Sequence, residues 1–352
     1  MNTPAQVVRA AATAAPSTAK ASGPRSSWPI RTIRKHPHLY GAICKARLAY
    51  SRRIASAREQ ALYKKSSQLW EMNPSEAAHS EHLKQHGYAL VGDFIPAEVV
   101  DALYQKADHL FKDLRLDFQY GYSVWSNERP TLRGLSYEEL QATEKVVSLE
   151  DPLVNLPECI QFGFHESLLK IVTNFLGYVP PSYKVTVVRD FALWRPKESS
   201  NFHKDNDEAD SVQLFIYLVD IDDHCGHLVY VPDSHRYDAH SCRPRLNRDL
   251  GIDANDGRYS DEEIAKYYPR NSWAELRTKR GSVAMVHGNG IHKGPCWPNP
   301  GAASNIARTA IKIDINGHKP KAHRTGHDNR MTRQQFDALS ELQKMFAYPI
   351  FV

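Results

Sequence analysis

His203 and Asp205, a histidine and a carboxylate two residues apart, are the pair in this chain best suited to bind a metal ion. They stand in the stretch SSNFHKDNDEADSVQLFIYLVDI, directly before an apolar run that predicts a core strand. A second strand-like stretch, GSVAMVHGNGIHKG, contains His292 between glycines at positions 290 and 294. Two histidines and one aspartate can occupy one face of an octahedral Fe(II) and leave positions open for a cosubstrate and oxygen. The pattern predicts an iron site formed by His203, Asp205 and His292.

Arg308 is the candidate for holding a cosubstrate beside this iron. It opens the strand-like stretch RTAIKIDIN, sixteen residues after His292. A guanidinium binds a carboxylate through two parallel hydrogen bonds, here the distal carboxylate of a dicarboxylate that chelates the iron. If Arg308 does not have this role, Lys184 and Arg189 are the next basic residues to test.

Two rival groupings involve the same kinds of side chain. His287 lies on the same segment as His292, five residues earlier. Strand side chains alternate in direction, so residues an odd number apart point to opposite faces and only one of the two can face the iron. The tetrapeptide HCGH at 224–227, with Cys242 downstream, would be a zinc site only if further pairs at metal-ligand spacing followed, and none does. We interpret it as a polar turn between strands.

Strand-like segments dominate the chain from about residue 180 onward. They are β-branched or aromatic runs separated by Gly, Pro and Asp, which is typical of a β-sandwich or barrel. The predicted strands are SYKVTVVRDFALW (182–194), SVQLFIYLVDI (211–221), GHLVYVPDSH (226–235), GSVAMVHGNGIH (281–292) and RTAIKIDIN (308–316).

Helical patterns precede these strands. A short strand at 88–91 is followed by a helix that Pro96 opens, and a second amphipathic helix at 166–177 is closed by Gly177. The predicted apolar face of the first helix consists of Val99, Val100, Leu103, Ala107 and Leu110. This order predicts a fold that is mainly β with flanking helices, with a double-stranded β-helix (jelly-roll, cupin-like) core.

The N-terminal region differs from the rest in composition. Residues 1–27 have no large apolar set to bury, so we expect them to be disordered. Residues 28–73 predict a basic amphipathic helical arm. Within it, residues 31–65 contain ten basic residues and one acidic residue, Glu59, which gives this segment a net charge of +9. Because the whole chain has a net charge of +5, the remainder has a net charge of −4. Three interpretations of the arm stay open. Residues 28–70 could bind an anionic membrane surface, the segment could be an organellar targeting sequence, or the helix could pack on its own domain.

The bulk composition excludes several classes of protein. With 352 residues, 41% of them apolar, the chain can fill a large core, which we place at 74–352. Five scattered cysteines predict reduced thiols and hence an intracellular, reducing compartment, most simply the cytoplasm. No apolar run is long enough for a spanning helix. Because the basic character belongs to the arm, we expect no nucleic-acid partner for the body.

Taken together, the His-x-Asp motif, GHLVYVPDSHR, G-x-x-H-x-G and the strand-opening arginine resemble the phytanoyl-CoA dioxygenase family of Fe(II)- and 2-oxoglutarate-dependent oxygenases. The early stretch HGYALVGDFIPAEVVDALYQKAD is similar to that family's N-terminal strand and helix, and the resemblance spans roughly residues 80 to 318. The family pattern favours His292 over His287. Asp233 stands where the family usually has glycine, which Asp tolerates in a left-handed turn.

The resemblance implies an enzyme with Fe(II), 2-oxoglutarate and O2, in which His203, Asp205 and His292 bind iron and Arg308 binds 2-oxoglutarate. Lys184 and Gln213 are further candidates for contacts with 2-oxoglutarate. The expected reaction is hydroxylation of an unactivated carbon of a small-molecule or lipid-like substrate, with release of succinate and CO2. The alternative is a noncatalytic jelly-roll binding module that has kept the fold. The sequence does not identify the substrate or the oligomeric state.

Overall fold

The computed structural model describes residues 67–116, 134–143, 146–180, 182–192, 201–205, 211–236, 245–246, 249, 258–297, 306–316, 329–347 and 349–352. The predicted disordered segment 1–27 and the arm up to residue 66 lie outside these residues, as do Cys44 and Cys242. Within the described part of the chain, Cys159 and Cys225 are buried free thiols.

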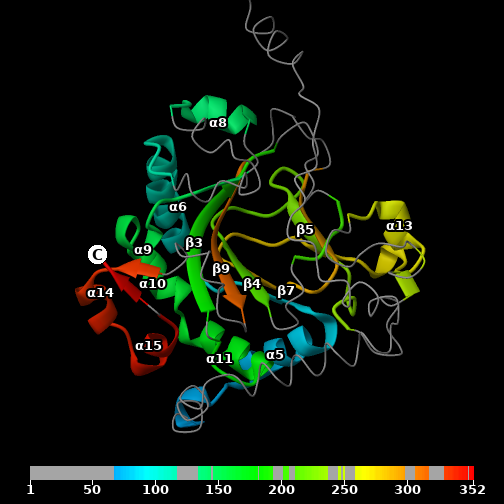
Figure 1. Cartoon of the computed structure of the whole chain (residues 1–352), viewed down its shortest axis with the longest axis horizontal. Helices are drawn as coiled ribbons and strands as arrows, with labels where there is room; N and C mark the ends of the chain where they lie inside the picture. The colour runs from blue at the N-terminus through cyan, green and yellow to red at the C-terminus, as the bar shows by residue number, and fades with distance from the viewer. Residues whose placement is uncertain are drawn as a thin grey trace, which may run out of the picture.

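The larger sheet of the described residues has six strands in the order β1-β7-β4-β9-β3-β2, and its central strands lie side by side in Figure 1. Every pairing in this sheet is antiparallel. The strands are β1 (Tyr88–Val91), β2 (Val146–Ser148), β3 (Ser182–Asp190), β4 (Val212–Tyr217), β7 (Val283–His287) and β9 (Arg308–Asn316). The longest pairing joins β3 to β9 from Ser182↔Asn316 to Asp190↔Arg308.

A smaller sheet faces it, with the order β6-β5-β8. Its strands are β5 (His227–Tyr230), β6 (Ala274–Leu276) and β8 (His292–Cys296). An isolated bridge pairs His203 with His292, which adds the segment around His203 to the outer side of β8. Two facing antiparallel sheets with this strand order form a jelly roll, so the predicted fold class is confirmed.

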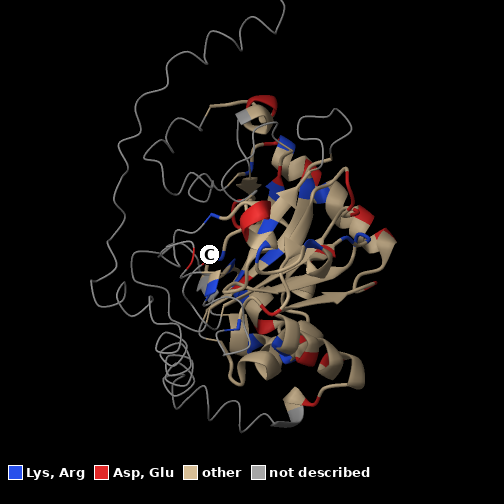
Figure 2. Ribbon diagram, turned by 90° about the vertical axis from the view of Figure 1, so that its right-hand side faces the viewer, with Lys and Arg blue, Asp and Glu red and all other residues tan. Residues whose placement is uncertain are grey.

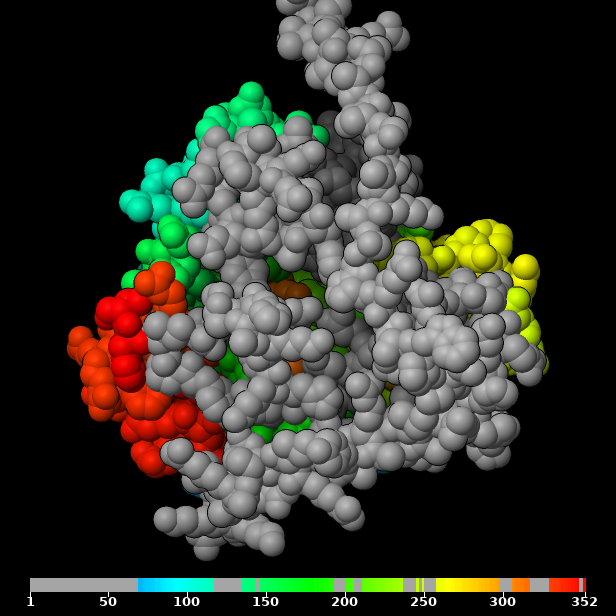
Figure 3. Space-filling model, in the orientation of Figure 1, coloured from blue at the N-terminus to red at the C-terminus, as the bar shows by residue number. Residues whose placement is uncertain are grey.

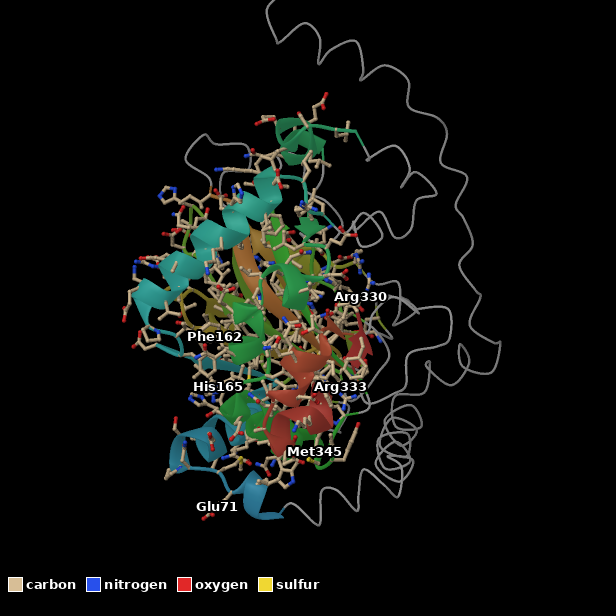
Figure 4. All side chains as sticks on the ribbon, turned by 90° about the vertical axis from the view of Figure 1, so that its left-hand side faces the viewer. Glu71, Phe162, His165, Arg330, Arg333 and Met345 are labelled. Atoms are coloured by element: carbon tan, nitrogen blue, oxygen red, sulfur yellow. The ribbon has the colours of Figure 1, made fainter. Side chains whose placement is uncertain are left out.

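Helices cover the outer face of the larger sheet. They are α5 (Pro74–His86), α6 (Ala97–Lys112), α8 (Tyr137–Thr143), α9 (Pro152–Asn155), α10 (Glu158–Gly163), α11 (Glu166–Leu176), α14 (Arg333–Asp337) and α15 (Glu341–Ala347). Figure 4 shows this layer, with Phe162 from α10, His165 at the start of α11 and Met345 from α15. A short parallel pair, β10 (Asn329–Met331) and β11 (Pro349–Phe351), accompanies α14 and α15. Helix α13 (Asp261–Ala265) lies on the opposite side of the molecule from these C-terminal elements (Figure 3).

The two faces of the larger sheet are built from alternating residues. Outward residues such as Val187, Ile311 and Leu214 join the helices in one apolar core. Inward residues such as Phe215 and Tyr217 join β5 and β6 in a second cluster between the sheets. The period of two in each strand therefore separates a packing face from an interior face.

Most predicted elements are confirmed. The strand at 88–91 and the strand at 308–316 have the predicted bounds, and α11 ends at Gly177, whose φ of 80° is left-handed. One predicted core residue of α6 is wrong: Val99 is 38% exposed. The buried stripe runs through Val100, Leu103, Ala107 and Phe111. Val99 lies one residue, about 100° of rotation, away from that stripe.

The segment 281–292 is not one strand, as predicted, but two strands in different sheets. β7 ends at His287 and β8 begins at His292. Between them the chain turns, with the Gly290 amide donating to the His287 carbonyl at 2.9 Å. The argument from side-chain alternation therefore does not apply to His287 and His292.

Trp70, three residues before the N-cap of α5, packs edge-on against Phe346 of α15 with ring centroids 5.9 Å apart. The last residues of the predicted arm thus contact the domain. Figure 2 shows Lys and Arg interspersed with Asp and Glu over the described body. None of the described helices combines the length and the apolar character that crossing a bilayer requires.

Candidate metal centre

His203 and His292 are held side by side by their main chains. The His203 amide donates to the His292 carbonyl and the His292 amide donates to the His203 carbonyl, both at 2.8 Å. Their imidazole rings have centroids 4.6 Å apart, and both side chains are buried. Residues 89 positions apart in sequence are thereby placed next to each other by backbone hydrogen bonds alone.

Asp205 completes the group, because its amide donates to the Gly288 carbonyl at 3.0 Å and so its side chain faces the two rings. Asp205 Oδ1 lies 3.7 Å from His203 Nε2, and Oδ2 lies 3.6 Å from His292 Nε2. One ligand atom from each residue lies within 4.8 Å of the other two. Within the described residues, no other group of three His, Cys, Asp or Glu side chains has this proximity.

The Nδ1 atom of each ring is within hydrogen-bond distance of a main-chain carbonyl. His203 Nδ1 lies 2.9 Å from the Asn201 carbonyl, and His292 Nδ1 lies 3.0 Å from the Gly290 carbonyl. A carbonyl only accepts, so each Nδ1 carries a proton, and each Nε2 faces Asp205. Burial and the neighbouring His292 lower the pKa of His203 to about 3, so that its ring is neutral near pH 7. Neutral imidazoles fixed in this way are the form that ligates metals.

Asp205 supplies the negative charge of the group. Burial alone would raise its pKa, but His292, His203, Lys312 and Arg258 outweigh burial and lower it. Its Oδ2 is buried and has no hydrogen-bond donor among the described residues. A buried carboxylate oxygen without a donor costs free energy unless a cation is present. The two imidazole Nε2 atoms and this carboxylate therefore fit a divalent cation such as Fe(II).

The loop after β5 and Gly290 bring these parts close together. Ser234 Oγ accepts from the Ile291 amide at 2.7 Å, which fixes the residue before His292. A Cβ at Gly290 would lie 1.7 Å from the Tyr230 hydroxyl, so only glycine fits there. Asp233 has a φ of 64°, the left-handed conformation predicted for it, and its carboxylate lies 3.5 Å from His86 Nδ1.

His287 lies elsewhere. Its ring packs against Phe175 and His235, with centroids 5.6 Å and 5.2 Å away, and its Nδ1 accepts from the Asn289 amide at 3.1 Å. The structure thus groups His292, and not His287, with His203 and Asp205.

Arg308 faces the space between the sheets. Its register partner is Asp190 on β3, and its Nε and Nη2 donate to Asp190 Oδ2 at 3.0 Å and 2.8 Å. Asp190 raises the pKa of Arg308 against the lowering effect of burial, so the guanidinium stays charged. Lys184 and Gln213 face the same space and are half-buried, and both are in register with Asp314 on β9. The interior therefore contains Arg308 and the two further predicted contact residues.

Arg189, the other predicted alternative, points the opposite way. Its guanidinium donates to Asp108 and to the Tyr137 hydroxyl, both at 2.8 Å, and lies 4.4 Å from the ring centre of Phe111. These residues belong to the helical layer, so Arg189 cannot reach a ligand between the sheets.

We expect the substitution Arg189→Met to lower the free energy of unfolding by about 2 kcal/mol, because it removes a buried donor from Asp108, which keeps its second partner Lys112 at 2.7 Å. Urea denaturation measures this loss. The apparent KM for 2-oxoglutarate should not change. A rise in this KM would place Arg189 in the binding site.

Sequence reasoning missed three interior residues, Asp190, Tyr217 and Lys312. Lys312 forms an ion pair with Asp314 at 2.9 Å, and its ammonium lies 6.0 Å from the ring centre of Phe215. The sequence did contain a signal for Lys312, because it lies four positions after Arg308 in one strand and the two side chains must share a face. Asp190 and Tyr217 required knowledge of which strands are neighbours.

Comparison with known proteins agrees with this geometry. The family model "Phytanoyl-CoA dioxygenase (PhyH)" matches residues 83–296, more than half of the chain, which includes all three metal-ligand candidates. The match ends twelve residues before Arg308. A comparison with curated protein sequences gives no significant match.

Several solved structures are similar to this chain. The non-heme alpha ketoglutarate dependent carbocyclase SnoK from nogalamycin biosynthesis is 14% identical, with a TM-score of 0.44 over 70% of this chain and 85% of its own. EctD from S. alaskensis with bound Fe is 15% identical, with a TM-score of 0.47 over 70% and 79%. EvdO2 from Micromonospora carbonacea var. aurantiaca is 14% identical, with a TM-score of 0.43 over 72% and 94%.

Proposed function

We infer the reaction from family membership. This chain belongs to the phytanoyl-CoA dioxygenase (PhyH) family and is an Fe(II)- and 2-oxoglutarate-dependent dioxygenase. We propose that it hydroxylates an unactivated carbon of a small-molecule or lipid-like substrate. In the balanced reaction, one oxygen atom of O2 enters the substrate as a hydroxyl group. The other oxygen atom enters succinate, which forms with CO2 as 2-oxoglutarate is decarboxylated.

His203, Asp205 and His292 would hold the iron in this reaction. When bound, the iron supplies the redox chemistry that couples O2 to the decarboxylation. The chain's own contribution is to orient both imidazoles through the carbonyls of Asn201 and Gly290. Because these contacts are to the main chain, the ligands are preorganised before metal arrives.

Arg308 would bind the distal carboxylate of 2-oxoglutarate, and Lys184 and Gln213 would contact the cosubstrate nearer the iron. This arrangement is supported by the register, which puts Lys184 and Gln213 level with Asp314, whereas Arg308 lies six residues earlier on β9. A cosubstrate anchored by Arg308 would lie along the interior face of the larger sheet. The family match does not extend to Arg308, so the role of this residue rests on geometry.

The observation that carries the proposal is the buried, donor-free Oδ2 of Asp205 beside the imidazoles of His203 and His292. A noncatalytic binding module gains nothing from this costly arrangement, which makes the alternative the weaker one. The test is to incubate purified protein with Fe(II), 2-oxoglutarate and a metabolite library, and to measure succinate. We expect succinate above the uncoupled background with at least one compound class, and none from the Asp205→Ala protein. Equal succinate from both proteins would contradict the proposal.

The N-terminal arm is proposed to attach the enzyme to an anionic surface. Each basic residue near such a surface is worth on the order of 1 kcal/mol before screening. Since Trp70 packs on Phe346, a truncation should start at Ser67 so that this contact is kept. We expect this truncated protein to lose sedimentation with anionic vesicles and to retain turnover, and we expect salt to release the full-length protein. If the full-length protein does not bind the vesicles at low salt, the arm is instead a targeting segment or a helix docked on the domain. We also propose a reducing compartment, in keeping with the free thiols of Cys159 and Cys225.

A further inference from the structure

Arg258 lies next to His203 across a pair of short extended segments. Phe202 and Tyr259 form an isolated antiparallel bridge, in which each amide donates to the other residue's carbonyl, at 3.1 Å and 2.8 Å. In an antiparallel pair, the residue after one partner is opposite the residue before the other, so His203 is opposite Arg258. The side chains of such a non-hydrogen-bonded pair lie close together on the same face.

This pairing extends the smaller sheet beyond β8 and separates its side chains by face. Tyr230 on β5 is in register with His292 on β8, and His292 forms a bridge with His203. Tyr230 belongs to the apolar cluster between the sheets, whereas Tyr259 belongs to the cluster on the outer face of the smaller sheet. Tyr230, His292 and His203 thus form one row on the inner face. Arg258 continues this row, on the side where the metal group lies.

Arg258 is also close enough to act on the metal group electrostatically. Burial has the largest effect on the pKa of His203 and on that of Asp205, lowering the first and raising the second. Arg258 is among the charges that lower both pKa values. A nearby cation disfavours a protonated imidazole and favours an ionised carboxylate, so both effects agree with the proximity that the register gives. Arg258 is exposed, whereas His203 and His292 are buried, so Arg258 lies at the solvent side of the metal group.

Two other cations that face the interior already have acidic partners. Arg308 donates to Asp190 at 2.8 Å. Lys312 forms an ion pair with Asp314 at 2.9 Å. When Fe(II) and 2-oxoglutarate are bound, Asp205 makes the metal group net negative, and this charge repels an anionic substrate. A cation next to the group offsets that repulsion, whereas a neutral substrate does not require one.

We propose that Arg258 binds an anionic group of the substrate, a carboxylate or a phosphate, and so selects anionic compounds for hydroxylation. This inference rests on the proposed function. It concerns the substrate and not 2-oxoglutarate, because Arg258 extends the smaller sheet whereas Arg308 belongs to the larger one. A guanidinium can donate two parallel hydrogen bonds to either anionic group. Since Arg258 and His203 are direct neighbours, the anionic group is held only a few bonds from the carbon that reacts.

The test measures binding to protein that is loaded with Mn(II) and saturating 2-oxoglutarate under nitrogen, where no turnover occurs. The probes are small carboxylates and phosphate monoesters, each paired with its neutral amide or alcohol. A rise in melting temperature identifies the compounds that bind, and calorimetric titration gives their affinities. We expect members of one anionic set to bind about tenfold or more tightly than their neutral counterparts, and the set that does so distinguishes a carboxylate from a phosphate.

Arg258→Gln should remove this preference. We expect the affinity for the anionic probes to fall about tenfold or more, the range for a hydrogen bond to a charged group, while the neutral probes, 2-oxoglutarate and Mn(II) bind as before. In the wild-type protein, added salt should weaken binding of the anionic probes more than that of the neutral ones.

Arg270→Gln is the matched control, since it removes the same charge from an exposed arginine elsewhere. The Arg270 guanidinium donates to Asp261 and Glu262, and its carbon lies 5.2 Å from the ring centre of Trp273, which packs against the outer cluster of the smaller sheet. This variant should keep the preference for anions.

The outcomes separate the inference from the proposed function. Wild-type protein in which no anionic probe binds better than its neutral counterpart, or a preference that survives Arg258→Gln, would overturn the inference and leave the proposed function standing. An equal loss of preference in Arg270→Gln would also overturn it, because the effect would then come from overall charge. Wild-type protein that binds Mn(II) but not 2-oxoglutarate would overturn both.

Discussion

Replacement of His292 by alanine is expected to abolish turnover and to reduce Fe(II) affinity by well over a hundredfold. The substitution removes one of the two imidazole nitrogens that face Asp205 and leaves too few protein ligands for tight binding. Substitutions that only disturb the orientation of a ligand cost about 10- to 100-fold, so loss of the ligand itself should cost more. Metal content after dialysis against Fe(II) under nitrogen, and succinate formation, measure the two effects.

His287→Gln is the matched comparison for His292→Ala. His287 packs on Phe175 and His235 and is not part of the metal group, so this variant should bind Fe(II) normally and lose only stability. A normal thermal transition in His292→Ala would show that the loss of iron is not a loss of folding. The assignment is wrong if His287→Gln loses iron while His292→Ala keeps it.

Arg308→Lys is expected to raise the apparent KM for 2-oxoglutarate about a hundredfold while iron stays bound. Lysine is preferred to alanine in this test because removing the cation altogether would strand the buried carboxylate of Asp190, at a cost of about 3–5 kcal/mol in stability. An ammonium can neutralise Asp190 but cannot also present the directed donors of a guanidinium. The dependence of succinate formation on 2-oxoglutarate concentration gives the constant, and metal analysis gives the iron content.

Lys312→Gln separates Arg308 from its nearest rival. Lys312 shares the interior face of β9 and is one of the charges that lower the pKa of Asp205, so it lies closer to the metal group. If Arg308 binds the distal carboxylate, Lys312→Gln should change the constant by less than Arg308→Lys does. The reverse order would move the anchoring role to Lys312.

The sequence could predict the parts of this protein that depend on local pattern. Gly177 ends α11 because a left-handed residue closes a helix, and β9 has its predicted bounds because apolar residues alternate through it. The His-x-Asp spacing identified two of three metal-ligand candidates because both lie within one short segment. Family resemblance supplied the choice of His292.

What the sequence could not predict depends on which distant segments are neighbours. The pairing of Asp190 with Arg308 joins residues 118 apart, and it follows from the register of β3 and β9. The turn between β7 and β8 sends His292 into a different sheet, so a rule for residues within one strand gave no valid argument there. Val99 was misplaced because a one-residue error in helical phase exposes a predicted core position.

The alternation along β9 has a consequence for how this enzyme can diverge. Ile311, Ile313 and Ile315 hold the sheet to the helical layer, whereas Arg308, Lys312 and Asp314 occupy the intervening even-numbered positions on the interior face. Mutations that retune ligand preference can therefore accumulate at even-numbered positions other than Arg308, whose pairing with Asp190 also contributes to stability, while the odd-numbered positions maintain the core. A descendant lineage can acquire a new substrate without first acquiring compensating mutations in its core.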